Sequence, residues 1–118
     1  MRIRDVASVL DAEVLCRSDL LETEVKSACG SDMMSDVLAY VKDHAVLLTG
    51  LVNPQVVRTA EMMDMKCIVF VRGKNPSEQI ITLAEEANIV ILRSSYRMYT
   101  SCGRLYAAGL QNEGSDMV

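Results

Sequence analysis

Three short apolar stretches of the sequence end in side chains that proteins use to hold anions. The stretches are AVLLTG (45–50), CIVFVRG (67–73) and IVILRS (89–94). Arginine and lysine bind phosphate through charge and hydrogen-bond donors, and the N-terminus of a following helix adds backbone N–H groups. In an open parallel sheet such strand ends meet at one edge, where ligands bind. We therefore predict an anion or nucleotide site there, formed by Gly50, Asn53, Gln55, Arg72, Gly73, Lys74, Arg93 and Ser94.

Neither common phosphate-binding signature completes this pattern, because G-x-x-x-x-G-K-[ST] and G-x-G-x-x-G are both absent. In the predicted site, the backbone N–H groups of residues 53–56, except that of the proline, would meet the anion. Arg72 and Lys74 would supply positive charge. The alternative is that Arg72, Lys74 and Arg93 are ordinary solvated loop charges.

The acidic residues and cysteines offer weaker candidates. Asp32 and Asp36 stand four residues apart, a spacing that suits a hard cation on one helix face. Because no further oxygen ligands stand near these two carboxylates, we interpret them as helix-capping residues and predict no metal site. The cysteines show no ligand spacing and are interpreted as buried structural thiols: Cys16, Cys29, Cys67 and Cys102. His44 is the single histidine, and no catalytic triad or acid–base pair is visible, so we predict that the chain is not an enzyme.

Composition narrows the class of protein. A chain of 118 residues suits one domain, which we place at residues 1–110, followed by a flexible tail at 111–118. The net charge of −4 argues against binding to nucleic acid or to an anionic membrane. No apolar run approaches the roughly 20 residues that a transmembrane helix needs. The lack of a signal-peptide pattern and of a disulfide framework predicts a reduced, cytoplasmic protein.

The apolar pattern predicts the elements that carry these residues. Short runs rich in β-branched residues are typical of buried parallel strands, and the stretches between them have the length of crossover helices. Asn53-Pro54 and Asn75-Pro76 each predict a helix start, with asparagine as the cap. The last helix is predicted over 95–108, with Gly109 as its stop. We predict an α/β fold with three layers, α/β/α, around a mainly parallel sheet.

The N-terminal third has a weaker pattern. RIRDVASVL (2–10) is predicted as a helix, and EVLC (13–16) and TEVKSAC (23–29) as strands. SDMMSDVLAYV (31–41) predicts a helix with Ser31 as its N-cap. Its buried stripe is predicted to contain Met34, Val37, Leu38 and Val41.

Methionines cluster in two neighbouring segments, at Met33-Met34 and at 62–65. Met62 and Met63 point in different directions on one helix, so one of them is available for a subunit interface or a pliable groove. This raises an alternative to the ligand site, in which the chain is a ligand-free dimerisation or protein-interaction module. A plain core role for the methionines is the simpler interpretation.

Three quoted segments resemble the DRTGG-domain family: GSDMMSDVLAYV (30–41), the run from LLTGLVNPQ to NIVIL (47–92), and MYTSCGRLYAAGL (98–110). The resemblance covers residues 3–110. The motif that names the family is rewritten here, since Leu51-Val52 stand where the family has Asp-Arg. Val71-Arg72-Gly73 stand where it has Thr-Gly-Gly, so Gly50 and Gly73 are the matching positions.

The resemblance implies a fold similar to the N-terminal domain of HPr kinase/phosphorylase. It also implies a regulatory or dimerising role rather than catalysis. Family members that this chain resembles include stand-alone proteins encoded near iron-only hydrogenases, some with names that invoke iron–sulfur binding. We therefore expect a homodimer that assists a hydrogenase or a phosphate-metabolising partner. A weaker alternative is an iron–sulfur or hydrogenase accessory protein that uses Cys29 and Cys102 across the dimer; the cofactor, if any, stays unknown.

Overall fold

The computed structural model describes residues 1–40 and 44–111. The predicted tail is therefore outside the described residues from 112 onward, as is Val41. The elements in chain order are α1 (Ile3–Val9), β1 (Glu13–Cys16), the 3-10 helix η1 (Ser18–Leu20), β2 (Ser27–Gly30), α2 (Met34–Tyr40), β3 (Ala45–Thr49), α3 (Pro54–Met62), β4 (Cys67–Phe70), α4 (Glu78–Glu86), β5 (Val90–Arg93) and α5 (Met98–Ala107).

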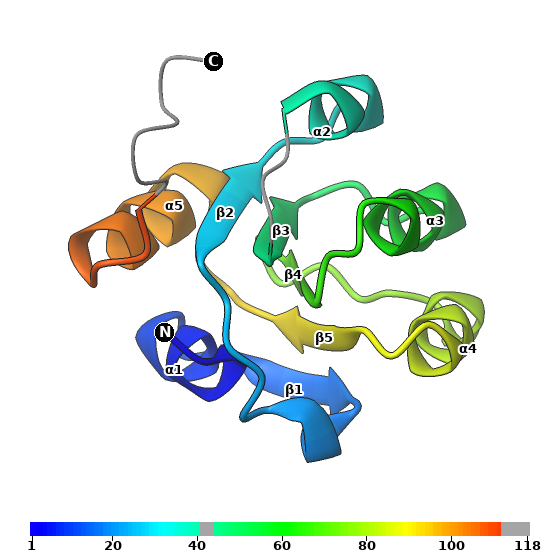
Figure 1. Cartoon of the computed structure of the whole chain (residues 1–118), viewed down its shortest axis with the longest axis horizontal. Helices are drawn as coiled ribbons and strands as arrows, with labels where there is room; N and C mark the ends of the chain where they lie inside the picture. The colour runs from blue at the N-terminus through cyan, green and yellow to red at the C-terminus, as the bar shows by residue number, and fades with distance from the viewer. Residues whose placement is uncertain (41–43, 112–118) are drawn as a thin grey trace.

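A five-stranded sheet in the order β1-β5-β4-β3-β2 forms the centre of the molecule. Strands β2 to β5 run parallel, and β1 pairs antiparallel with β5. Helices α2, α3 and α4 cover one face, and α1 and α5 cover the other (Figure 1). The prediction of a three-layer α/β/α fold with a mainly parallel sheet is confirmed.

The sheet separates two apolar cores. Val46 and Leu48 pack with α1 and α5, whereas Leu47 packs with α2, α3 and α4. All five residues of β3 are buried, because this central strand has a helical layer on each side. The alternation of side chains along a strand explains why the sequence shows continuous apolar runs here instead of an alternating pattern.

The helix starts follow the local capping chemistry. The Asn53 side chain accepts the Gln55 N–H at 2.8 Å, with Pro54 in the first turn of α3, as predicted. The predicted start at Asn75-Pro76 is wrong, because α4 begins after Ser77, whose hydroxyl accepts the Ile80 N–H at 3.3 Å. A serine two residues beyond the asparagine caps equally well.

The second helix also differs from its prediction. Ser31 does not cap it, because the Ser31 hydroxyl accepts the Met33 N–H at 3.0 Å in a turn that precedes α2. Val37 is fully buried, but Leu38 is 43% exposed and lies outside the stripe. The strand predicted over 23–29 is shorter and begins at Ser27. Alternation within a short segment does not say where pairing with a neighbouring strand begins.

The last helix is shorter than predicted at its start. It begins at Met98 and is followed by Gly109, whose φ of +108° is the conformation that glycine adopts readily. Met98, Cys102 and Leu105 pack against the core on one side. Among the described residues nothing lies within 4 Å of a Cβ built on Gly103, so Gly103 does not mediate close helix packing.

Candidate functional site

The carboxyl ends of three parallel strands and the start of α5 surround a pocket of about 380 Å³. β2, β3 and β4 end side by side in the sheet. The chain after β5 turns back across this edge into α5 (Figure 1). The lining residues come from these four places: Gly30, Ser31, Asp32, Gly50, Val71, Arg72, Arg97, Met98 and Tyr99.

Arg72 reaches this pocket from an unusual backbone conformation. Its φ is +60°, and Gly73 follows with a φ of +66°. Outside glycine, such a left-handed residue costs about 1–3 kcal/mol and persists where its surroundings hold it. Here the Arg72 N–H donates to the Tyr96 carbonyl and the Gly73 N–H donates to the Ser94 carbonyl, both at 2.8 Å. The segment after β5 therefore holds Arg72 in place.

Gly50 provides the space that the Arg72 guanidinium occupies. A Cβ built on Gly50 would lie 2.8 Å from Nη2 of Arg72 and 3.4 Å from its Cζ. Any larger side chain must displace the guanidinium. The glycine after β3 is thus explained by close approach of the arginine to the backbone.

A carboxylate of the chain itself occupies the donors at the end of β3. Asp32 Oδ1 accepts the Gly50 N–H at 2.7 Å and the Thr49 hydroxyl at 3.0 Å. Asp32 precedes α2, so it does not share a helix face with Asp36 as the cation interpretation required. Among the described residues, no group of three or more histidine, cysteine or acidic side chains is placed to hold a metal ion.

The two arginines of the pocket keep their donors available. Within residues 1–40 and 44–111, the side chains of Arg72 and Arg97 make no hydrogen bond or ion pair with another side chain or backbone group. Arg97 is the N-cap residue of α5 and provides no side-chain cap. The first-turn N–H groups of that helix are therefore also left without a side-chain acceptor. The pocket combines two guanidinium groups with one carboxylate.

Two of the predicted site residues hold the structure together instead. The Arg93 guanidinium donates to Glu13 Oε2 at 2.9 Å and to the Gly73 carbonyl at 3.3 Å. Ser94 is buried, and its hydroxyl donates to the Leu10 carbonyl at 2.8 Å. Both side chains tie β5 to neighbouring segments and do not line the pocket.

The remaining predicted residues lie at the same edge but outside the pocket. Asn53 caps α3, so the N–H groups of Gln55 and Val56, which were predicted to meet an anion, already have acceptors on Asn53. Lys74 is exposed, and its N–H donates to the Val71 carbonyl. Of the predicted set, Gly50 and Arg72 line the pocket, and Gly73 follows directly.

Asp32, Arg97 and Tyr99 line the pocket but were not predicted as site residues. Asp32 was interpreted as a helix cap, and the helix proved to start beyond it. Arg97 and Tyr99 were assigned to the body of the last helix. The sequence feature that could have identified them is R-M-Y (97–99), in which a basic and an aromatic residue begin four residues after the end of β5.

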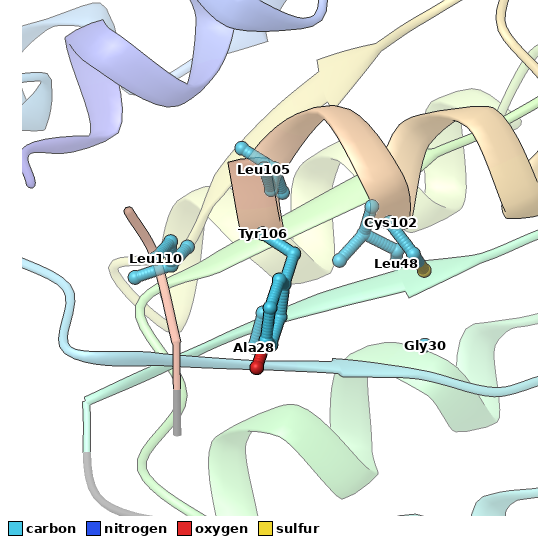
Figure 2. A pocket seen from close by; sticks show the side chains of 7 residues that line it. All are labelled: Ala28, Gly30, Leu48, Cys102, Leu105, Tyr106 and Leu110. Carbon is cyan, nitrogen blue, oxygen red and sulfur yellow. The ribbon is translucent and has the colours of Figure 1, made fainter. Parts of the chain in front are cut away.

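A second, apolar pocket of about 190 Å³ lies between α5 and strands β2 and β3. Cys102, Leu105 and Tyr106 of α5 line it, and Figure 2 shows the Tyr106 side chain extending toward Ala28 of β2. Gly30 lines both pockets, and a Cβ built on it would lie 2.6 Å from the Cys102 Sγ and 3.2 Å from the Met98 sulfur. Gly30 therefore permits the close approach of α5 to the edge strand.

The cysteines are poorly suited to act as nucleophiles at neutral pH. Burial raises the pKa of the Cys29 and Cys102 thiols. The charge of Cys102 raises the pKa of Cys29 further. Cys67 is fully buried in β4, and burial raises its pKa strongly. Thiolates are the reactive form, so these thiols are expected to react slowly.

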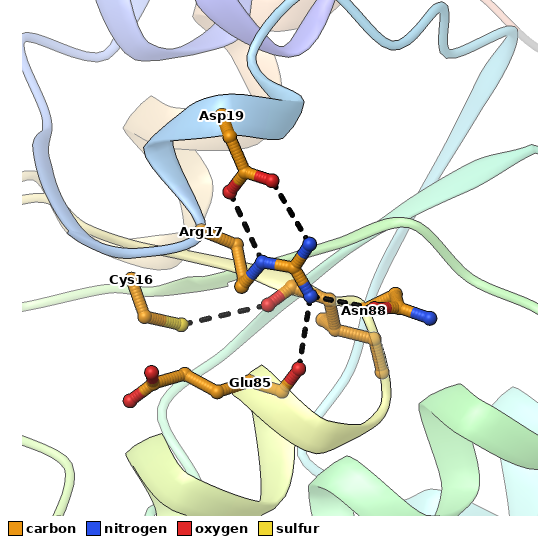
Figure 3. Close-up of polar contacts among 6 residues, drawn as sticks. Cys16, Arg17, Asp19, Glu85 and Asn88 are labelled. Carbon is orange, nitrogen blue, oxygen red and sulfur yellow. Dashed lines mark hydrogen bonds and ion pairs between the residues drawn. The ribbon is translucent and has the colours of Figure 1, made fainter.

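A third arginine, Arg17, lies at the opposite edge of the sheet and uses its donors (Figure 3). Its Nε and Nη2 donate to the two carboxylate oxygens of Asp19 at 3.0 and 2.9 Å. Its Nη1 donates to the Glu85 carbonyl at 3.0 Å and to the Asn88 side chain. The hydrogen bond from Arg17 holds the pKa of Asp19 below its usual value. These hydrogen bonds cap the C-terminal end of α4.

The DRTGG domain family model matches residues 5–108. Among solved structures, the chain is similar to the CBS and DRTGG domains of the regulatory region of Clostridium perfringens pyrophosphatase, which were solved with the activator diadenosine tetraphosphate. The TM-score is 0.67 at 13% sequence identity, a level at which the likeness shows the fold.

The match covers 88% of this chain and 45% of the clostridial one, so this chain spans less than half of that length. No curated protein shows significant similarity to the sequence. None of the described helices has the length and apolar character to cross a membrane.

Proposed function

The chain belongs to the DRTGG domain family, and we propose that it is a non-catalytic regulatory module that binds a small anionic ligand or a nucleotide. The observation that carries the proposal is the pocket at the carboxyl edge, where Arg72 and Arg97 line one space and lack partners among the described residues. A solvated arginine elsewhere on the surface is common. Two arginines from different elements around one pocket are the arrangement that binds phosphate or carboxylate groups.

The energetics favour an anionic ligand over an empty pocket. A hydrogen bond to a charged group contributes about 1.5–3 kcal/mol, and the guanidinium donors of Arg72 and Arg97 have no competing protein acceptor among the described residues. Asp32 opposes a purely anionic ligand by charge repulsion. Two guanidinium groups outweigh this repulsion best when the ligand carries several anionic oxygens, because a single weak anion can pair with only one of them.

The pocket supports binding better than catalysis. Ser31 contributes an aliphatic hydroxyl to the lining, and that hydroxyl donates to the Met33 carbonyl and accepts the Met33 N–H. No histidine lines this pocket among the described residues, and the neighbouring Asp32 carboxylate accepts the Gly50 N–H and the Thr49 hydroxyl, so no serine–histidine pair is formed here. The clostridial relative supports a regulatory role, since its DRTGG domain is part of a regulatory region solved with a nucleotide activator.

The proposal includes further parts that rest on the family resemblance. The protein would be cytoplasmic and homodimeric, and it would assist a hydrogenase or a phosphate-metabolising enzyme. The ligand would change how the module acts on that partner. The predicted lack of membrane and nucleic-acid partners belongs to the same proposal and follows from the net charge of −4.

A second candidate function is a protein-interaction module. Met33 before α2 is 62% exposed and Met62 at the end of α3 is 71% exposed, and these two helices contact each other. Exposed methionines are adaptable contact residues. This alternative needs no ligand, and the first experiment separates the two candidates.

The first experiment is a thermal-shift screen with phosphate compounds and nucleotides on the wild type, on Arg72→Ala with Arg97→Ala, and on Arg58→Ala. Arg58 is an exposed arginine on α3 outside the pocket, so its variant controls for loss of positive charge. A ligand at 100 times its Kd stabilises the wild type by about 2.7 kcal/mol. We expect this shift to vanish in the double variant and to persist in the control.

Two results would redirect the assignment. A shift of equal size in all three proteins would move the ligand away from this pocket. If no compound shifts any of them, the interaction module becomes the better function, and light scattering of Met62→Ser against the wild type would test its oligomeric state.

A further inference from the structure

The pocket has an aromatic rim in addition to its arginines. Tyr99 lines the pocket and is 90% exposed. It is the second residue of α5, and Arg97, two residues before it, is one of the two cations. An exposed ring beside cationic groups is the platform on which nucleic-acid bases stack, since every base has a flat face.

Asp32 adds a third chemical requirement. Its Oδ1 accepts two hydrogen bonds, whereas its Oδ2 has no partner among the described residues. A ligand made of phosphate alone would meet only repulsion from this carboxylate. A ligand that also carries hydroxyl donors would satisfy it, and the sugar of a nucleotide places hydroxyls between the base and the phosphates.

We infer that the ligand is a nucleoside polyphosphate. Arg72 and Arg97 hold its phosphates, Asp32 accepts from a sugar hydroxyl, and the base lies on Tyr99. This assignment rests on the proposed function and names the ligand class of that same pocket. It also assigns three separate tasks to four residues, and each task can be removed by substitution without removing the others.

The dimensions of the pocket agree with this division. A volume of about 380 Å³ is near the lower end of the range of about 300–1,000 Å³ for small-molecule sites. Phosphates and sugar fill such a space, and the base extends to the exposed rim where Tyr99 lies. The apolar pocket behind Gly30 is not needed for this ligand.

The test measures binding of ATP, ADP, adenosine and inorganic tripolyphosphate by titration calorimetry. Tyr99→Ala removes the ring, and Tyr99→Phe restores a ring without the hydroxyl. Tyr106→Ala is the matched control, because Tyr106 is an exposed tyrosine on the same helix that does not line this pocket. Asp32→Asn keeps an oxygen that accepts the Gly50 N–H but removes the negative charge.

We expect ATP to bind at least about tenfold more tightly than tripolyphosphate, a difference of about 1.4 kcal/mol. Tyr99→Ala should weaken ATP about tenfold and leave tripolyphosphate unchanged, while Tyr99→Phe and Tyr106→Ala behave like the wild type. Asp32→Asn should tighten tripolyphosphate and thereby reduce the preference for ATP.

Two results overturn the inference, and they are distinguishable. Equal affinities for ATP and tripolyphosphate, unchanged by Tyr99→Ala, would remove the base and sugar subsites but leave the anion pocket. If none of the four compounds binds the wild type, so that Arg72→Ala has no binding to remove, both the ligand class and the proposed function fail.

Discussion

Arg17 and Arg72 have the same backbone conformation at opposite edges of the sheet but use their side chains differently. Their φ angles are +54° and +60°, in the region that non-glycine residues rarely adopt. The Arg17 guanidinium donates to a carboxylate, a helix carbonyl and an amide (Figure 3). The Arg72 guanidinium lies over Gly50 and has no hydrogen-bond acceptor among the described residues.

The difference shows how one strained conformation can serve two purposes. At the amino edge, the contacts of the Arg17 side chain offset the strain and stabilise the end of α4, where a cation also interacts favourably with the helix dipole. At the carboxyl edge, backbone hydrogen bonds from residues 72 and 73 hold the strained residue. The Arg72 side chain is then left for a ligand.

The largest effect should come from replacing the saturated arginine. Arg17→Ala removes four hydrogen-bond contacts, two of them to Asp19, and leaves the Glu85 carbonyl with only a backbone donor, the Asn88 N–H, after α4. We therefore expect the Tm to fall by several degrees. Arg72→Ala should change the free energy of unfolding by no more than about 0.5 kcal/mol. Calorimetry of the two variants measures this contrast. Equal losses would show that Arg72 also has a structural role.

A second test displaces Arg72 without removing it. Gly50→Ala places a Cβ where the guanidinium now lies, and the flexible side chain can move away at little cost in stability. We expect ligand affinity to fall about tenfold, or about 1.4 kcal/mol, with a Tm near that of the wild type. Gly103→Ala is the control, because its Cβ meets open space among the described residues. Unchanged affinity in Gly50→Ala would mean that the guanidinium need not lie over the backbone.

A third test relieves the backbone strain at Arg72. Glycine removes a left-handed penalty of about 1–2 kcal/mol, partly offset by a gain of about 0.4–1 kcal/mol in unfolded-state entropy. Arg72→Gly should therefore leave the free energy of unfolding unchanged or raise it by up to about 1.6 kcal/mol, while ligand binding is lost. Urea denaturation measures the first quantity. Arg17→Gly, with the same relief, should still be less stable than the wild type because its side-chain contacts are lost.

The smallest effect concerns pH. Because Arg17 lowers the pKa of Asp19 in the folded state, the stabilisation from this pair is complete above the unfolded pKa of about 3.9. It is lost as the pH falls through the folded value. The wild type should therefore lose slightly more stability than Asp19→Asn between pH 5 and pH 2 in thermal melts at low salt. Parallel curves would show that the exposed pair contributes nothing measurable.

Much of the fold could be predicted from local patterns. β-branched runs at 45–49 and 67–70 became central strands, because buried parallel strands need apolar side chains on both faces. Asn53-Pro54 predicted its helix start, since capping acts within three residues. Leu38 was misplaced because helical periodicity does not say which side of a short helix a neighbouring element covers.

The candidate site could be predicted only in part. Gly50 and Arg72 were found because each directly follows an apolar run that ends at the carboxyl edge. Asn53, Gln55 and Arg93 carried suitable chemistry but proved to be occupied with capping or an ion pair. Whether a side chain is available to a ligand depends on whether the chain itself already supplies a partner for it. Such a partner can be distant in sequence, as Glu13 is from Arg93.

By itself, the sequence determined the three central parallel strands, the start of α3, the layered α/β class and the edge of the sheet where a site could form. These properties depend on contacts between residues that are close in the chain. The tertiary structure alone decided that Asp32 occupies the donors at the end of β3 and that Arg97 and Tyr99 join Arg72 around one pocket. Those contacts join four separate segments, and their geometry is set by how α5 packs on the sheet.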